Sequence, residues 1–338
     1  MKKIAFWNNY TNFSHNQAFN PNAYGIGEDL GYPIILLKEK LFEKGYILET
    51  LDMDEPENYD AVIFCDVPNP NTCCVDLSRI PKRKKYLFIA ECEKINKNNG
   101  RKDLLNDFEI VFAYNDDLIA TAGYKKLNLT NKMKNPMNID FHKKSFSVII
   151  AGNKSSMQKG ELYSERLKAI KFMEKKHPKD FDLYGIGWDL KYFTGIRPIR
   201  ALNHFNLIRK IFTKKRKSYK GKIDKKIKVL SQYKFCFCYE NFKTIPGYIT
   251  EKIWDCFFAG CIPVYYGAPN ILNYIPDNCF IDFRNFSSYE DLYNYLNSID
   301  QKKYEEYISN ITKFLQTEKA YTFSADYFVE SIMSEIIK

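Results

Sequence analysis

Short apolar runs alternate with amphipathic stretches from the start of the chain to about residue 140. Apolar runs of this length, bounded by turn residues, are typical of buried parallel strands, and an apolar period near 3.6 residues between them predicts a helix. Strands are expected at 4–7, 46–51, 61–65, 85–90 and 110–113, with a helix over 32–44. The order strand, helix, strand predicts a doubly wound α/β domain.

A second series of the same kind follows the first. Strands are expected at 145–151, 181–184, 234–239 and 261–266, and helices at 162–175, 250–259, 289–298, 302–317 and from about 325. A chain of 338 residues is long for one hydrophobic core. We therefore expect two Rossmann-like α/β domains that face a central cleft, where ligands bind at the carboxyl ends of the strands.

The predicted domain boundaries follow these two series. Residues 1–143 are expected to form an N-terminal domain, and residues 144–320 a C-terminal, ligand-binding domain. The last segment, 321–338, is expected to be a helix whose apolar positions Val329, Ile332, Met333 and Ile336 share one face. Such a face predicts that this helix packs back toward the N-terminal domain.

Targeting and redox signals are weak. The apolar run 4–7 is too short for a signal peptide, and no run approaches the roughly 20 apolar residues of a membrane span. The expected location is therefore the cytoplasm. The nine cysteines have no CxxC spacing, which predicts buried reduced thiols, and the spacing of the four histidines does not favour a zinc site.

Much of the net charge of +10 is concentrated in one stretch. Residues 209–228 hold eleven Lys or Arg and a single acid, Asp224. Such a run is compatible with a solvated basic face, with a patch that attracts diphosphates, or with peripheral contact at the inner face of an anionic membrane. Phe212 and Tyr219 interleave with the charges, but no recognised nucleic-acid module accompanies them, so no nucleic-acid partner is expected.

The segment most suggestive of chemistry runs from 233 to 255. An apolar strand leads into a polar loop and then into a helix, with Thr250 placed to cap the helix and Glu251 and Lys252 in its first turn. A carboxylate is favourable near the positive end of a helix, whereas a lysine is not. A lysine at this position therefore indicates an anionic partner, and a diphosphate would be such a partner. Solvent exposure of Glu251 and Lys252 is the alternative interpretation.

The same segment resembles the signature of the α-1,3/4-fucosyltransferase family. The elements that carry the resemblance are Tyr-Lys-Phe at 233–235, Tyr-Glu-Asn at 239–241, Gly-Tyr-Ile-Thr-Glu-Lys-Ile at 247–253 and Ala-Gly-Cys-Ile-Pro-Val-Tyr-Tyr-Gly at 259–267. Weaker resemblance extends over 88–99 and 152–188. It implies a GT-B-type fold, GDP-L-fucose as donor, inversion at the anomeric carbon, and transfer to a hydroxyl of an acceptor oligosaccharide, such as O3 of N-acetylglucosamine or glucose.

The resemblance also implies which residues bind the donor. Contacts to the nucleotide, ribose or phosphates are expected from Asn241, Tyr248, Thr250, Glu251 and Lys252. An arginine of the basic run, Arg216 or else Arg209, is expected to contact the diphosphate. Together with Lys252 this arginine would stabilise the leaving GDP. These cations could replace a metal, so none is expected to be required, although a divalent cation could stimulate the reaction.

Two further residues are candidates for the donor cleft. Asn153 follows the expected strand 145–151, and Arg166 lies in the expected helix 162–175. The alternative for Asn153 is a local turn, and the alternative for Arg166 is a side chain that faces water.

A general base must accept the proton of the acceptor hydroxyl. By resemblance this base is Glu91, with Glu93 as the alternative; without the resemblance both would be interpreted as solvent-facing loop acids. The Asp52-Met53-Asp54 triplet has the DxD pattern that holds a divalent cation in other glycosyltransferases, but it lies away from the expected donor site and is discounted.

Two other functions stay open at this point: a GT-B transferase that uses a different nucleotide sugar, and a glycan-binding protein without turnover. The loops expected to face the acceptor, 8–31 and 67–76, contain no motif that identifies a glycan.

Overall fold

The computed structural model describes residues 1–24, 29–69, 76–191, 193, 195–213 and 216–337. Residues 25–28 and 70–75, which belong to the two loops expected to face the acceptor, lie outside the described residues. The chain divides into two compact units. Unit 1 comprises Met1–Met133, Pro246–Tyr248 and Thr317–Lys338, and unit 2 comprises Lys134–Ile245 and Ile249–Gln316.

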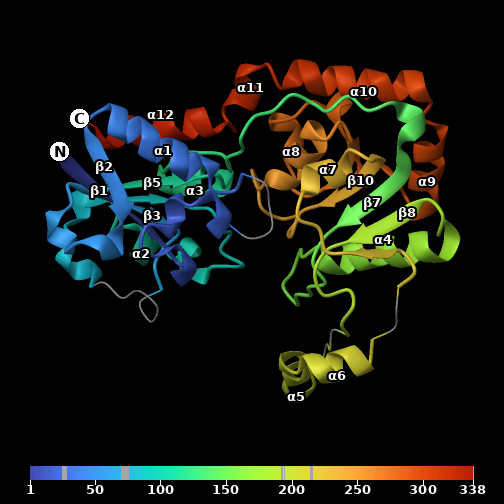
Figure 1. Ribbon diagram of the computed structural model, residues 1–338, viewed down its shortest axis with the longest axis horizontal. Coiled ribbons are helices and arrows are strands. Elements are labelled where there is room, and N and C mark those ends of the chain that lie inside the picture. Colours follow the sequence, from blue (N-terminus) through green and yellow to red (C-terminus); the bar gives the residue numbers. More distant parts are fainter. Residues whose placement is uncertain (25–28, 70–75, 192, 194, 214–215, 338) are drawn as a thin grey trace. The chain divides into compact units, whose positions relative to one another are not determined.

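Unit 1 is built around a parallel six-stranded sheet in the order β2-β1-β3-β4-β5-β6 (Figure 1). The strands are β1 (Lys2–Asn8), β2 (Tyr46–Thr50), β3 (Ala61–Cys65), β4 (Lys85–Phe88), β5 (Ile110–Ala113) and β6 (Lys125–Lys126). The helices of this unit are α1 (Tyr32–Glu43), α2 (Lys102–Leu105), α3 (Asp116–Ala122), α11 (Glu318–Tyr321) and α12 (Ala325–Ile336). The order reverses between β1 and β3, so the loops after these strands flank a switch point of the kind that binds ligands in α/β sheets.

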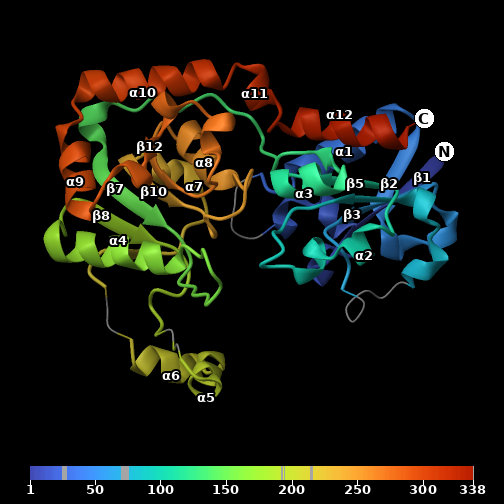
Figure 2. The same ribbon diagram turned by 180° about the vertical axis from the view of Figure 1, so that it is seen from behind.

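The C-terminal helix belongs to the core of unit 1. Phe328 and Ile332 of α12 are buried in one cluster with Leu37 of α1. The ring of Phe328 meets Phe88 edge-on at 5.2 Å between centroids. Both views show α12 along α1 (Figures 1 and 2). The apolar stripe of α12 is therefore satisfied by this contact.

Unit 2 contains the second parallel sheet, in the order β12-β11-β10-β7-β8-β9. Its strands are β7 (Ser145–Ile150), β8 (Phe181–Tyr184), β9 (Tyr219–Gly221), β10 (Tyr233–Tyr239), β11 (Ile262–Tyr266) and β12 (Ile281–Asp282). Its helices are α4 (Tyr163–Lys176), α5 (Arg197–Ala201), α6 (Asn206–Ile211), α7 (Lys226–Leu230), α8 (Glu251–Phe258), α9 (Tyr289–Ser298) and α10 (Gln301–Phe314). This is the Rossmann strand order, with its switch point between β7 and β10.

The two doubly wound parallel sheets predicted from the sequence are confirmed. The observed boundaries differ from the expected 143/144 and 320/321: the chain leaves unit 1 after Met133 and returns at Thr317, and the three residues Pro246–Tyr248 belong to unit 1. No helix among the described residues is long and apolar enough to cross a membrane.

Candidate functional site

A buried carboxylate marks the carboxyl end of β10. The Glu240 side chain has no exposed surface, and its two oxygens accept hydrogen bonds from the backbone nitrogen and the hydroxyl of Thr250, both at 2.8 Å. One of these oxygens also accepts from the Lys252 ammonium at 3.1 Å. A charge is tolerated in a protein interior only when it is paired and hydrogen-bonded, and Glu240 meets this condition.

Thr250 occupies the N-cap position of α8, but the structure corrects its expected role. Its side chain makes no cap hydrogen bond to the helix. The hydroxyl instead donates to Glu240 and accepts from Lys252 at 2.8 Å. The Thr250 hydroxyl therefore leaves the first-turn backbone donors of α8 to other acceptors, a feature that suits an anion site.

Lys252 lies in a network of alternating charges at the start of α8. It is flanked by Glu240 and by Glu251, whose carboxylate is 3.8 Å away. Burial opposes the charge on Lys252, but these two acids outweigh burial and raise the pKa of its ammonium. The anionic partner inferred for Lys252 from the sequence therefore includes Glu240, a residue of its own chain. Solvent exposure of Lys252 is wrong as an interpretation, because only 22% of its side chain is exposed.

Lys226 of α7 extends the network. Its ammonium lies 2.6 Å from Asp255 and 3.5 Å from Glu251. Burial opposes the charge of Glu251, but Lys252 and Lys226 outweigh it and lower the pKa of Glu251 to about 2. Glu251 is thus charged at neutral pH, and the acids and ammonium groups at the start of α8 hold one another in place.

Arg166 holds the end of β10 from α4. Its guanidinium donates to the Tyr239 carbonyl at 2.6 Å, to the Glu240 carbonyl at 2.7 Å and to the Asn241 side-chain oxygen at 3.0 Å. The residue is 7% exposed, so the alternative of a water-facing helical arginine is wrong. Arg166 therefore orients the loop that carries Glu240 and Asn241.

The loops on both sides of the switch point of unit 2 are fastened. The Leu162 nitrogen donates to the Asn241 carbonyl at 2.9 Å, which ties the segment before α4 to the loop after β10. The side chain of Asn153, after β7, donates to the carbonyls of Gly187 and Leu190 at 2.9 and 3.3 Å. Asn153 thus braces the loop after β8.

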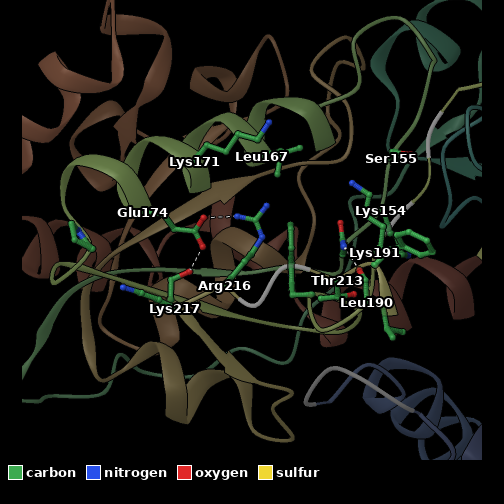
Figure 3. A pocket seen from close by; sticks show the side chains of 15 residues that line it. Lys154, Ser155, Leu167, Lys171, Glu174, Leu190, Lys191, Thr213, Arg216 and Lys217 are labelled. Carbon is green, nitrogen blue, oxygen red and sulfur yellow. Dashed lines mark hydrogen bonds and ion pairs between the residues drawn. The ribbon is translucent and has the colours of Figure 1, made fainter. Parts of the chain in front are cut away.

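A basic pocket of about 680 Å³ adjoins these loops in unit 2 (Figure 3). Arg216 lies in it with its guanidinium ion-paired to Glu174 and 5.5 Å from the centre of the Trp188 ring. Asn153 lines the same pocket, whereas Lys252 is not among its lining residues. Among the described residues, the charged ones that line the pocket are Lys154, Lys171, Glu174, Lys191, Arg216 and Lys217. Five cations against one acid make the pocket suitable for an anion.

Tyr248 belongs to unit 1. Its ring lies 5.6 Å from that of Tyr114, and Tyr248 is 3% exposed. The preceding Gly247 has a φ of +77°, and a Cβ there would lie 2.3 Å from the Tyr114 carbonyl oxygen. Glycine is therefore required at 247 for this contact.

The candidate bases Glu91 and Glu93 follow β4 in unit 1. Both are half-buried, so neither is a freely solvated loop acid. The Glu91 nitrogen donates to Asp66 at 3.0 Å. Burial raises the pKa of the Tyr114 hydroxyl, and the nearby charges of Glu93, Asp66 and Glu91 raise it further. The two candidates thus share one electrostatic environment.

Asp66 lies behind these two acids, at the end of β3. Its Oδ1 accepts from the Ala90 nitrogen at 2.7 Å and from the Asn99 side chain at 2.8 Å, in addition to the Glu91 nitrogen. Asn99 also donates to the Glu91 carbonyl at 2.8 Å. Asp66 and Asn99 together fix the backbone that carries Glu91.

The discounted DxD acids have partners in the protein. Asp52 accepts from the His15 nitrogen at 2.8 Å, and Asp54 from the Lys3 ammonium at 2.7 Å. Within the described ranges, no three acidic, histidine or cysteine side chains form a group that could hold a metal ion.

Comparison with known proteins adds a family to this geometry. Residues 197–331 match the family model "Glycosyltransferase family 10 (fucosyltransferase) C-term". The match covers 135 of the 338 residues, so it is this segment that is similar to the family. The matched residues include the Glu240–Lys252 network and Arg216, while Arg166, Asn153 and Glu91 lie outside them. The resemblance detected in the motif elements between residues 233 and 267 is therefore confirmed.

Curated relatives are similar to the chain over a short segment. The chain is 39% identical over 84 residues to the GDP-fucose protein O-fucosyltransferase 3 of Gallus gallus, which is 24% of this chain and 18% of the relative. It is 33% identical over 81 residues to the alpha-(1,3)-fucosyltransferase FucT of Helicobacter pylori, 24% of this chain and 17% of that relative. The similarity thus spans less than a fifth of either relative's length.

A solved structure is similar over the whole chain. An alpha1,3-fucosyltransferase determined with GDP superimposes with a TM-score of 0.57 over 100% of this chain and 90% of that chain, at 15% identity. At this identity the likeness describes the fold, which is that of GT-B glycosyltransferases.

Three residues of the candidate site were missed in the sequence: Glu240, Lys226 and Asp66. Glu240 had a detectable signal, because a carboxylate directly after an apolar strand requires a buried partner. Lys226 and Asp66 had none, since their contacts depend on how distant segments meet.

Proposed function

We propose that this chain is an inverting fucosyltransferase that moves L-fucose from GDP-fucose to a hydroxyl of an acceptor oligosaccharide. The observation that carries the proposal is the Glu240–Thr250–Lys252 network at the start of α8, within the segment that matches family 10. The GDP-fucose named for a relative and the GDP named for a solved structure support the choice of donor.

The departing GDP develops negative charge on its β-phosphate. In the proposal this charge is stabilised by the Lys252 ammonium and by the first-turn backbone donors of α8, which the Thr250 hydroxyl leaves to other acceptors. Glu240 holds Lys252 in place, so little reorganisation is needed when the charge forms. Asn241, Tyr248, Thr250 and Glu251 are proposed as donor contacts around it.

Arg216 is proposed as the second cation for the diphosphate. Its ion pair with Glu174 would have to yield or be shared, since a guanidinium can serve two acceptors through its fork of donors. Asn153 lines the same pocket, and Arg166 acts through the Asn241 side chain. The two cations perform the task that a divalent metal performs elsewhere, and we propose transfer without a metal.

Glu91 is the proposed general base, with Glu93 as the alternative. Its backbone is fixed on both sides, by the Glu91 nitrogen to Asp66 and by Asn99 to the Glu91 carbonyl. A positioned carboxylate of this kind typically contributes about 10² to 10⁴ in rate.

A transfer assay with labelled sugar nucleotides tests the proposal. GDP-fucose, GDP-mannose and UDP-galactose are offered in EDTA with lactose, N-acetyllactosamine and a serine/threonine peptide as acceptors. Label transfer from GDP-fucose alone, lost about 10²-fold or more in Glu91→Gln and retained in Glu306→Gln, is the expected result. Transfer from another donor would instead assign a different GT-B transferase. Donor binding without transfer to any acceptor would leave a glycan-binding protein.

A further inference from the structure

The segment between β8 and β9 exposes apolar side chains to an unusual degree. Of the sixteen large apolar side chains that are exposed among the described residues, six lie between positions 196 and 212. Leu207, Ile211 and Ile196 are 74%, 70% and 68% exposed, and the other three are Ile199, Phe205 and Phe212. A gathering of this kind on a protein surface marks an interaction site.

The apolar side chains lie on a braced element. Helices α5 and α6 follow each other in the chain and are joined by the turn Leu202–His204, which contacts both (Figures 1 and 2). The Arg209 carbonyl and side chain bond to the backbone of Lys191, each at 3.0 Å. The Asn203 side chain makes two hydrogen bonds of 2.8 Å to the backbone of Phe193. We name residues 196–212 the α5–α6 surface.

The charge around this surface has one sign. From Leu190 to Ile223 the sequence contains eleven Lys or Arg and no Asp or Glu. Arg197, Arg200 and Lys210 are exposed on the surface itself, and no ion pair with a carboxylate is formed by these three within the described residues. Exposed aliphatic side chains rimmed by unopposed cations are complementary to a bilayer surface that contains anionic lipids.

We propose that the α5–α6 surface binds the interface of an anionic lipid bilayer. Its aliphatic residues insert among the acyl chains, and Arg197, Arg200 and Lys210 lie at the level of the phosphate headgroups. Four of the six apolar residues are Ile or Leu, which cannot stack on bases, so a bilayer fits the surface better than a nucleic acid does. Phe212 also lines the basic pocket, but the residues changed in the tests below, Leu207, Ile211, Arg200 and Lys210, do not.

Flotation of the whole chain with lipid vesicles tests the proposal. Vesicles of phosphatidylcholine alone are compared with vesicles that also contain phosphatidylglycerol, at low and high salt. The expected result is flotation with the anionic vesicles only, reduced by salt because the headgroup attraction is screened.

Two pairs of variants separate the apolar and the charged contributions. Leu207→Glu with Ile211→Glu is expected to lower the partition coefficient at least about tenfold, while Leu272→Glu, at an apolar position of unit 2 that is 57% exposed, leaves it unchanged. Arg200→Glu with Lys210→Glu is expected to abolish the preference for phosphatidylglycerol, while Lys302→Glu with Lys313→Glu retains it. Thermal melting and GDP titration check that each variant is folded.

Three outcomes would overturn the proposal. One is wild-type protein that stays unbound with anionic vesicles at low salt. Another is flotation that Leu207→Glu with Ile211→Glu does not weaken. The third is a protein that binds polyuridylate but not vesicles, and that loses this binding in Arg200→Glu with Lys210→Glu. This result would assign the surface to a nucleic acid.

Discussion

The ammonium of Lys252 lies 3.1 Å from a carboxylate oxygen of Glu240, whose side chain is completely buried at the end of β10. A lysine in the first turn of a helix meets an unfavourable dipole, and Glu240 compensates for it. Lys252 is consequently held by the protein before any ligand arrives.

Loss of Glu240 should destabilise the protein. Glu240→Ala leaves the Lys252 ammonium and the Thr250 nitrogen without this acceptor, and removal of one partner of a buried ion pair typically costs about 3–5 kcal/mol. Glu240→Gln should cost less, because its amide oxygen still accepts a hydrogen bond. Urea unfolding measures both, with Glu306→Ala on α10 as a surface control. A Glu240→Ala protein as stable as the control would contradict this role.

Even the conservative replacement of Arg166 by lysine should lower the stability of the protein. Arg166→Lys keeps the charge but loses the planar fork that reaches the Tyr239 carbonyl, the Glu240 carbonyl and the Asn241 side chain. We expect unfolding to become easier by about 2–4 kcal/mol, together with weaker GDP binding. Chemical denaturation and titration are compared with Arg101→Lys, an exposed arginine. Unchanged GDP affinity in a destabilised Arg166→Lys would show that the arginine stabilises the fold without positioning Asn241.

Asp66 should make stability depend on pH. Burial raises the pKa of its carboxyl above the ordinary value, against the opposing hydrogen bonds from Glu91, Ala90 and Asn99. Because the folded pKa exceeds the unfolded pKa of about 3.9, its contribution is fully present below that value and is lost as pH rises through the folded pKa. Relative to Asp66→Asn, the wild type should therefore melt lower at pH 7 than it does near pH 4. Calorimetric melts across this range check the sign. A melting temperature of the wild type that rises relative to that of Asp66→Asn as pH increases would refute the prediction.

Two glycines with similar backbones offer a matched test of the Tyr114–Tyr248 contact. Gly123 has a φ of +67° and open space around its Cα, whereas a Cβ at Gly247 would lie 2.3 Å from the Tyr114 carbonyl oxygen. Gly123→Ala should cost about 1 kcal/mol from the left-handed conformation alone, and Gly247→Ala about 2–5 kcal/mol because the backbone must also move. Equal losses of unfolding free energy in urea for the two variants would mean that the backbone at Tyr114 moves without cost to accommodate the added Cβ.

The apolar pattern predicted the central strands, and the packing of distant segments explains what it missed. Strands β3, β5 and β8 begin and end where expected, because each is a short apolar run between turn residues. The edge strands β6, β9 and β12 have only two or three residues and no apolar run of their own. They form because a neighbouring strand supplies a hydrogen-bonding edge, which a local pattern cannot reveal.

The candidate site also divides into residues that the local sequence predicts and residues that only tertiary packing brings together. The motif placed Asn241, Thr250, Glu251 and Lys252 around one strand and one helix, because they are close in sequence. Arg166 was a candidate for the donor cleft, but its hydrogen bonds to the end of β10 could not be predicted. Helix α4 precedes β10 by more than fifty residues, and only tertiary packing brings the guanidinium to the Tyr239 carbonyl. The basic run 209–228 indicated charge, but not the apolar side chains that α5 and α6 expose beside it.

The central claim is that the Lys252 network binds a guanine nucleotide diphosphate, and calorimetric titration with GDP, UDP and CDP in EDTA tests it most directly. We predict that GDP binds most tightly, that Lys252→Ala weakens it at least about tenfold in a protein that still melts cooperatively, and that Lys313→Ala has no effect. Equal affinity for the three nucleotides, or GDP binding that Lys252→Ala leaves intact, would contradict the account.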